Sequence, residues 1–180
     1  GATRTGISTG VNLFDGLTDI TVGSWPNWLP RGLDIYHAQV SNVIGGAPVA
    51  TLDFTALPDY SLSTTDAQGN VWRSYQYASR TTRRVVGGAA VGYATVTGNV
   101  WGMPDSAALS ITSAIDIQVR ARGDAWTTGS GTLVGKYAGA GGRSYIFQQA
   151  GSNGISLTLS QDGSNQLQVL TGSSLSLVGI

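Results

Sequence analysis

The clearest structural pattern in the chain is Ile155-Ser156-Leu157-Thr158-Leu159-Ser160-Gln161-Asp162-Gly163-Ser164-Asn165-Gln166-Leu167-Gln168-Val169. Apolar and polar residues alternate in its first six positions and again in its last three, which is the period of a β-strand with one buried face. Asp162-Gly163 lies in the polar gap between the two runs and favours the positive φ angles of a tight hairpin turn. The stretch therefore predicts a β-hairpin over residues 155–170.

The same alternation recurs along the rest of the chain. Ile115, Ile117 and Val119 share one side of a predicted strand, whereas polar residues occupy the other side. Similar runs between Gly- and Asn-rich turns predict strands at 17–23, 33–40, 49–54, 70–77, 91–96, 132–137 and 144–149. Only residues 104–109, which begin with a proline, favour a short helix. This pattern predicts an all-β fold of antiparallel strands, in a sandwich or barrel.

The composition of the 180-residue chain supports this fold class and fits one domain. All ten acidic residues are Asp, and Lys136 is the single lysine. Because Glu and Lys are strong helix formers, their near absence argues against a helical bundle. The chain has no cysteine, which excludes disulfide scaffolds and cysteine-ligated metals.

Charge and hydropathy narrow the possible partners. The formal net charge is +0 and 11% of the residues are charged, so the sequence predicts no nucleic-acid partner. No apolar run approaches the roughly 18 residues of a membrane-spanning segment, so no membrane insertion is expected. A surface with so little charge lacks the repulsion that keeps small soluble proteins apart. We therefore expect the protein to work within an assembly.

Three short motifs lack the context that their chemistry needs. Residues 6–10 match the G-x-S-x-G nucleophile elbow, but only five residues precede them and no helix is predicted after them. Gly135-Lys136 lacks the earlier glycine and the following Ser or Thr of a phosphate loop. Residues 122–124 spell Arg-Gly-Asp, which a strand end followed by a turn also produces. The sole histidine, His37, lies in a predicted strand, so no catalytic residue is predicted.

The aspartates form no recognisable catalytic or metal-binding set. A glycosidase needs two carboxylates beside the scissile bond, and the only pair four residues apart, Asp15 and Asp19, lies in a predicted loop. Four other aspartates lie beside predicted turns: Asp59, Asp66, Asp105 and Asp124. We expect their side chains to cap those turns. Binding of Ca²⁺, whose ligands are also common beside turns, is the alternative.

The densest aromatic cluster is Trp25-Pro26-Asn27-Trp28-Leu29-Pro30. Its prolines predict a rigid loop, on which flat rings can stack against sugars while Asn27 binds hydroxyl groups. Packing of both tryptophans against one end of the core is the alternative, and the sequence slightly favours it. Trp25, Asn27 and Trp28 are the candidate ligand-binding residues.

Residues 99–160 resemble the opening half of a laminin-G-like, concanavalin-A-like domain, in versions found in tail proteins of phages that infect high-GC Gram-positive bacteria. The residues that carry this resemblance are Asn99-Val100-Trp101-Gly102-Met103-Pro104-Asp105-Ser106-Ala107-Ala108-Leu109, Ile115-Asp116-Ile117-Gln118-Val119-Arg120, Trp126, Thr132-Leu133-Val134-Gly135-Lys136-Tyr137, Arg143-Ser144-Tyr145 and the hairpin at Asp162-Gly163. Residues 14–77 resemble the closing half of the same domain. The resemblance to that half is carried by Leu17-Thr18-Asp19-Ile20-Thr21-Val22-Gly23, Arg31-Gly32-Leu33-Asp34-Ile35-Tyr36-His37-Ala38-Gln39-Val40, Leu52-Asp53-Phe54 and Thr65-Asp66-Ala67-Gln68-Gly69-Asn70-Val71-Trp72.

The resemblance implies a two-sheet antiparallel jelly-roll sandwich with its halves in reversed order. Residues 1–84 would be the closing half, 85–92 a Gly-rich connector and 93–180 the opening half. A half-sandwich leaves an apolar face and strand edges open, so we expect strands 33–40 and 115–121 to need each other. We predict that both halves form one sandwich within a single chain, with the two termini within about 20 Å, a few strand spacings. Exchange of halves between subunits is the alternative.

Members of this family mostly bind glycans or proteins, often with Ca²⁺, and some are glycosidases. The resemblance therefore implies a non-enzymatic component of a phage virion tail or surface fibre that binds host glycans. It would be located in the virion or outside the cell, with other copies of itself, other virion proteins and cell-surface glycans as partners. A carbohydrate-binding module of a secreted bacterial enzyme is the alternative, and a glycan-cleaving enzyme is a third interpretation.

Overall fold

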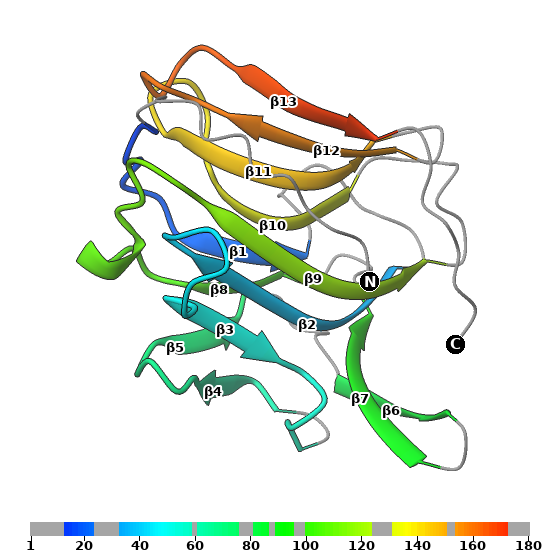
Figure 1. Ribbon diagram of the computed structural model, residues 1–180. Helices are drawn as coiled ribbons and strands as arrows, with labels where there is room; N and C mark the ends of the chain where they lie inside the picture. The colour runs from blue at the N-terminus through cyan, green and yellow to red at the C-terminus, as the bar shows by residue number, and fades with distance from the viewer. Residues whose placement is uncertain are drawn as a thin grey trace.

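The computed structural model describes residues 13–23, 33–58, 61–75, 81–86, 89–95, 100–123, 131–150 and 154–172, and these residues form an all-β fold (Figure 1). The strands are β1 Ile20–Gly23, β2 Leu33–Ser41, β3 Ala50–Asp53, β4 Ser63–Thr65, β5 Val71–Ser74, β6 Thr81–Val86, β7 Ala89–Thr95, β8 Val100–Met103, β9 Asp116–Gly123, β10 Gly131–Tyr137, β11 Arg143–Ala150, β12 Gly154–Leu159 and β13 Leu167–Gly172. Within these ranges the only helical element is a 3₁₀ turn, Ala107–Leu109. It lies inside the stretch 104–109 where the sequence predicts a short helix.

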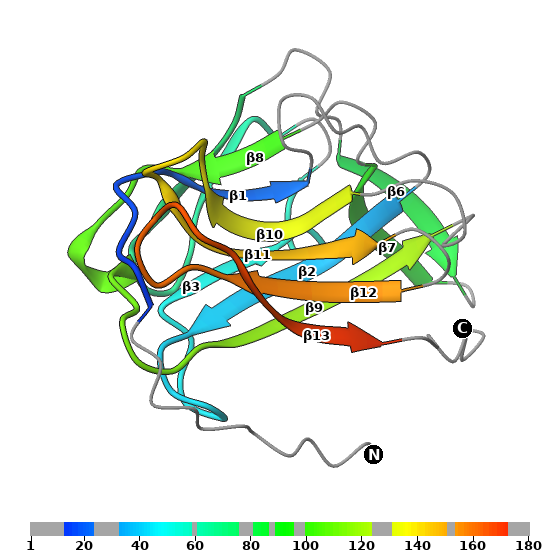
Figure 2. The ribbon, with the colours of Figure 1, turned by 90° about the horizontal axis from the view of Figure 1, so that it is seen from above.

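The strands form two antiparallel sheets that lie in separate layers (Figure 2). The larger sheet has eight strands in the order β13-β12-β11-β10-β1-β8-β5-β4. In the smaller sheet, β2 pairs with β9 along one edge and with β3 and β7 along the other, and β6 pairs with β7. Two antiparallel sheets in two layers agree with the sandwich-like all-β class that the sequence predicts.

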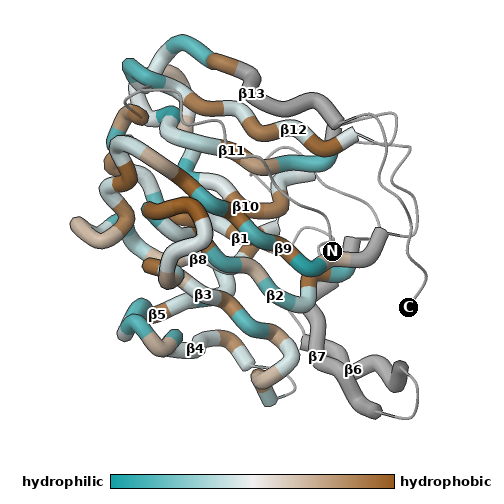
Figure 3. Tube along the Cα trace, viewed as in Figure 1, coloured by the Kyte–Doolittle hydropathy of each residue, from teal (hydrophilic) through white to brown (hydrophobic). Residues whose placement is uncertain are grey.

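One apolar core joins the two sheets. Apolar residues alternate with polar ones along β9 (Figure 3), and Ile117 is buried while Ile115 and Val119 pack against the core, as the sequence predicts. Aromatic side chains from different strands meet in this core: the rings of Phe54 and Trp101 lie edge to face, with centroids 5.5 Å apart. Burying these faces against each other supplies the main driving force for folding.

The hairpin predicted over 155–170 is present, because β12 and β13 pair from Leu159↔Leu167 to Ile155↔Gly172. Its connection differs from the predicted tight turn. The strands end at Leu159 and begin again at Leu167, which leaves a seven-residue loop. The Asp162 carboxylate accepts hydrogen bonds from the backbone N–H groups of Ser164 and Asn165, which widens the turn.

Three strands are missing from the sequence prediction: β4, β6 and β8. Strand β8, Val100–Met103, is the most informative, because all four of its residues are buried. A strand that is buried on both faces does not alternate, so periodicity alone does not reveal it. It lies in the larger sheet between β1 and β5.

The two halves of the chain are paired within one molecule. Strand β2 from the first half runs along β9 from the second half, from Leu33↔Gly123 to Ser41↔Asp116. Strand β1 lies between β8 and β10. The stretch 85–92, predicted as a connector, contains the ends of β6 and β7, which pair at Val86↔Ala89. Both chain termini and Gly87-Gly88 lie outside the described residues.

Gly102 in β8 lets the ring of Tyr75 lie directly on the larger sheet. A Cβ atom at position 102 would clash with Cε2 of Tyr75. We expect Gly102→Ala to lower the free energy of unfolding by about 1–2 kcal/mol, measured by urea denaturation, because the ring must move.

Tyr75 itself provides a second measurement for the same variant. Its hydroxyl donates to Asp19 at 2.9 Å, and burial together with this carboxylate raises the pKa of Tyr75 to about 12. In Gly102→Ala the pKa should fall toward the usual value of about 10, followed by ultraviolet titration. Gly139→Ala is the control, because a Cβ there would meet nothing within 4 Å. Equal stability loss in both variants would contradict the expectation.

Candidate functional site

The sequence-predicted site does not fall in the part of the chain that the structure describes. Trp25, Asn27 and Trp28 all lie between β1 and β2, outside the described residues. The same holds for the G-x-S-x-G match at 6–10. These residues therefore stay predictions, and the candidate site is built from the described residues alone.

A cavity of about 330 Å³ lies on the larger sheet. It is lined by Thr132, Tyr137, Ala138, Gly139, Arg143, Ile146, Gln148, Thr158 and Gln166. These residues come from β10, β11 and β12, from the loop 138–142 and from the loop 160–166. A cavity of this size fits the lower end of the range for small-molecule sites.

The strand register places this cavity on the face of the sheet that points away from the core. Along β11, Tyr145 and Phe147 belong to the core or pack against it. Neighbouring residues of a strand point to opposite faces, so Ile146 and Gln148 lie on the other face. Gly135 and Thr158 are the register partners of Ile146, so the base of the cavity consists of one apolar side chain among small and polar ones.

Two loops that contact each other form the border of the cavity. The N–H groups of Gly141 and Arg143 both donate to the carbonyl of Gly163, at 2.8 and 3.2 Å. Gly141 and Gly163 have φ angles of 91° and 79°, which L residues with a side chain rarely adopt. These positive φ angles allow the 138–142 and 160–166 loops to lie against each other.

Asp162 holds the second loop in shape. Hydrogen bonds from the backbone and side chain of Asn165, from the backbone of Ser164 and from Ser160 outweigh slight burial and lower the pKa of Asp162 to about 2. The carboxylate is therefore ionised throughout the neutral range, in the form that accepts these bonds. The 160–166 loop, which includes Gln166, is thereby held in place beside Arg143.

The side chains at the border hold one another in place. The Arg143 guanidinium lies over the ring of Tyr137, 5.6 Å from its centroid, and one of its N–H groups donates to the carbonyl of Ser164. The Gln166 amide donates to the Tyr137 hydroxyl. The cavity therefore has a preorganised edge that combines an aromatic ring, a cation and an amide.

Some polar atoms in and beside the cavity lack a protein partner. Among the described residues, the Thr132 hydroxyl, the Nε of Arg143 and the Ser156 hydroxyl are buried without a hydrogen bond. Thr132 is only 2% exposed and lines the cavity. Ser156 is the register partner of Gln148. Buried polar groups usually find partners, and these atoms keep hydrogen-bonding capacity that no other described residue uses.

The cavity presents hydrogen-bonding side chains together with one aromatic ring and one cation. Its lining, which consists of described residues, includes no carboxylate and no imidazole, the usual groups for proton transfer. Asp15 pairs with Lys136 and Asp19 accepts from Tyr75, so each member of the predicted aspartate pair has a partner of its own. His37 lies on β2 in the smaller sheet, opposite Asp53 and Arg120.

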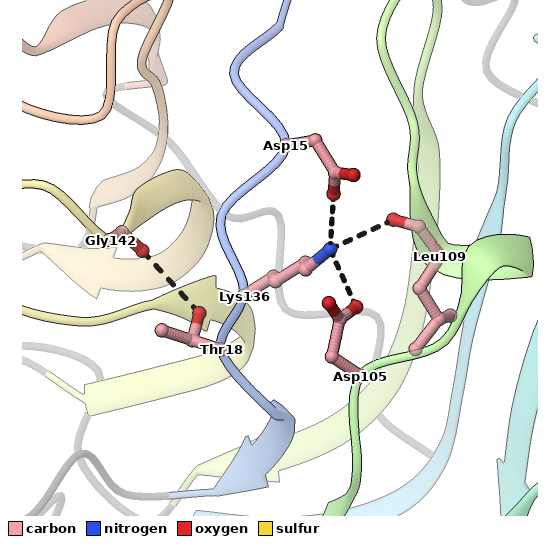
Figure 4. A network of polar contacts seen from close by, with 6 residues as sticks. All are labelled: Asp15, Thr18, Asp105, Leu109, Lys136 and Gly142. Carbon is pink, nitrogen blue, oxygen red and sulfur yellow. Dashed lines mark hydrogen bonds and ion pairs between the residues drawn. The ribbon is translucent and has the colours of Figure 1, made fainter.

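Lys136 forms a buried ionic cluster on the core side of β10 (Figure 4). Its ammonium group is fully buried, donates to Asp15 at 2.6 Å and to the Leu109 carbonyl at 3.3 Å, and lies 2.8 Å from Asp105. Burial raises the pKa of Asp15, but hydrogen bonds from Lys136 and Ser110 outweigh it and leave the pKa lowered. Gly135-Lys136 is therefore part of a structural strand rather than a phosphate loop.

The described aspartates that were calcium candidates do not fit a calcium site. The Asp66 carboxylate accepts from the N–H groups of Thr51, Gln68 and Asn70, from the Asn70 amide and from the Trp72 indole. Asp105 pairs with Lys136. Across the described ranges no group of three or more His or Asp side chains gathers where it would hold a metal ion. Asp59 and Asp124 lie outside these ranges.

Sequence reasoning missed the cavity because its residues follow no motif. Tyr137 and Arg143 flank the glycine-rich turn 138–142 at the ends of two paired strands. The sequence offered one clue to the cavity: an aromatic residue and a cation lie on either side of a predicted hairpin turn. It offered no such clue for Thr132, Gln148 and Thr158, because alternating polar residues are usual on the outer face of a strand.

Comparison with known proteins leaves the family of this chain open. No family model matches it, and no curated protein or solved structure shows significant similarity to it. Among the described residues, no helix has the length and apolar character needed to cross a membrane.

Proposed function

We propose that this chain is a non-enzymatic saccharide-binding module with a jelly-roll sandwich fold, and that it serves as a component of a phage tail or surface fibre that binds host glycans. The cavity on the outer face of the larger sheet carries the binding part of the proposal. The resemblance in the sequence and the low surface charge support the virion part, because a surface with little repulsion suits an assembly.

The chemistry of the cavity suits a saccharide. Sugars present hydroxyl groups that both donate and accept, together with apolar C–H faces. The Gln148 and Gln166 amides and the Thr132 and Thr158 hydroxyls offer matching donors and acceptors. The Tyr137 ring offers an apolar surface with a polar tip. Several exact hydrogen bonds on one preorganised surface give orientation and specificity.

A glycan array tests this proposal directly. The labelled wild-type protein should retain a defined subset of glycans, and Gln148→Ala should weaken that retention about tenfold, because one or two hydrogen bonds are lost. Gln118→Ala, on β9 in the other sheet, is the matched control and should bind as the wild type does. If no glycan is retained at all, the proposal is wrong.

The same array separates the cavity from the predicted tryptophan loop. If the cavity is the site, a Trp25→Ala/Trp28→Ala double variant that remains folded should retain glycans. Loss of retention in that variant, with Gln148→Ala unaffected, would place the site on the loop. A carbohydrate-binding module of a secreted enzyme would use the cavity in the same way. A catalytic domain elsewhere in the complete protein would favour that alternative.

A further inference from the structure

Arg143 gives the cavity an electrostatic character that a neutral sugar does not need. It is the only charged residue among the described residues that line the cavity. Its guanidinium is half-buried, stacked over Tyr137 and anchored by one N–H group on the Ser164 carbonyl. Its Nε is buried and has no hydrogen-bond partner. The arginine is thus fixed in position with part of its donor set unused.

Guanidinium N–H groups that have no partner in a partly buried site favour the binding of an anion. A guanidinium pairs with carboxylate or phosphate oxygens through two parallel N–H···O bonds, and one of the two common pairings uses Nε. Asp162, the one charged residue in the two bordering loops, does not fill this role, because its carboxylate accepts from the N–H groups of Ser164 and Asn165. No counter-ion lines the cavity within the described part of the chain.

A second observation points to the same place. Thr132 lines the cavity, is almost completely buried, and its hydroxyl has no hydrogen-bond partner. Leaving a buried hydroxyl unpaired is unfavourable. A ligand that fills the cavity would satisfy this hydroxyl and the arginine donors together. Hydroxyl and amide groups surround the single cation, which favours a polyhydroxylated molecule with one anionic group.

We propose that the cavity binds an acidic saccharide whose carboxylate or phosphate pairs with Arg143, while its hydroxyl groups bind Thr132, Gln148 and Thr158. This inference rests on the proposed saccharide-binding function and narrows it to a chemical class. Uronic acids and phosphate-substituted sugars share the required oxyanion. In this arrangement Tyr137 and Ser164 hold the guanidinium in the orientation that the anion needs.

The test uses matched ligands and isothermal titration calorimetry on the intact chain. Three oligosaccharides of the same length and linkage are compared: one neutral, one with a uronic acid and one with a phosphate substituent. We expect the wild-type protein to bind at least one acidic ligand about tenfold or more tightly than the neutral one, because a charge-assisted pair is gained. The tighter of the two acidic ligands identifies the source of the anion.

Variants at Arg143 locate the effect. Arg143→Gln should abolish the preference for the acidic ligand while keeping the affinity for the neutral one. Arg143→Lys should keep only part of the preference, because an ammonium group lacks the planar fork. Circular dichroism and a denaturation midpoint near that of the wild type show that the variants are folded. The comparison of ligands on the wild-type protein holds even if a variant does not fold.

The outcomes separate this inference from the function on which it rests. Equal affinity for the neutral and acidic ligands, with binding weakened by Gln148→Ala, would overturn the anion proposal and leave saccharide binding intact. A preference that survives in a folded Arg143→Gln variant would also overturn it. Failure of all three ligands, together with a negative glycan array, would overturn the proposed function itself.

Discussion

Replacing Lys136 by methionine should lower the free energy of unfolding by about 3 kcal/mol, measured by urea denaturation at pH 7. The ammonium group is fully buried and contacts both Asp15 and Asp105. Methionine fills a similar volume but leaves two carboxylates facing the same place without a cation. Both carboxylates are partly buried, with side-chain exposures of 33% and 20%, so leaving them together without a cation is destabilising.

Two further variants separate this charge effect from packing. Lys136→Met combined with Asp15→Asn and Asp105→Asn should recover most of the lost stability, because no unpaired charge remains. Arg73→Met removes a cation from an exposed position on β5 and should change stability by less than about 0.5 kcal/mol. A triple variant as unstable as Lys136→Met would show that packing, not charge, is responsible.

The dependence on pH gives an independent test, because acidification from pH 7 toward 4 should stabilise Lys136→Met and leave the Asp15 contribution in the wild type unchanged. In the wild type the pKa of Asp15 is lowered. Its contribution is therefore present above the unfolded value of about 3.9 and is lost as the pH falls through the lower folded pKa. In Lys136→Met, repulsion by the Asp105 carboxylate should raise the pKa of Asp15, so stability should increase as the pH falls from 7 toward 4. Parallel profiles would contradict this account.

Alternation of apolar and polar residues was enough to predict most of the fold. It predicts the strands that became β2, β9 and β12, since each buries one face and leaves the other polar. It fails for β8, where every residue is buried, and for the three-residue strand β4, which is too short to show a period. The loop after β12 also differs from prediction, because Asp162 binds the backbone beyond the Asp-Gly pair.

The candidate site was less accessible from sequence than the fold. The cavity depends on which outward-facing residues meet across three strands. Strand register determines which residues these are, and amino-acid composition does not reveal it. Tyr137 pairs with Arg143 across β10 and β11, but nothing in either residue type indicates that the guanidinium lies over the ring. Lys136 was conspicuous as the single lysine, yet its two aspartate partners lie far from it in the sequence.

Asp66→Ala should be the second strongly destabilising change, with a loss of about 3 kcal/mol in the free energy of unfolding. The Asp66 carboxylate ties the turn between β4 and β5 to the neighbouring strand β3, because it accepts from the backbone N–H of Thr51 at 3.0 Å and of Asn70 at 2.8 Å. It also accepts from the indole of Trp72, a residue only 1% exposed. Removing one carboxylate leaves several donors unpaired at once, and Trp72 fluorescence reports the change during denaturation.

Asp53→Ala is the matched control, because among the described residues the Asp53 carboxylate accepts only from Thr55, through its N–H at 2.9 Å and its hydroxyl at 2.6 Å. Its loss should be about 1 kcal/mol. Comparing Asp66→Ala with Asp53→Ala also decides between the two roles predicted for Asp66, which are capping a turn and binding Ca²⁺. If its carboxylate serves the turn alone, adding Ca²⁺ or a chelator should leave the wild-type denaturation midpoint unchanged, since the N–H donors already occupy both oxygens. A rise in that midpoint with Ca²⁺ that disappears in Asp66→Ala but persists in Asp53→Ala would make Asp66 a calcium ligand instead.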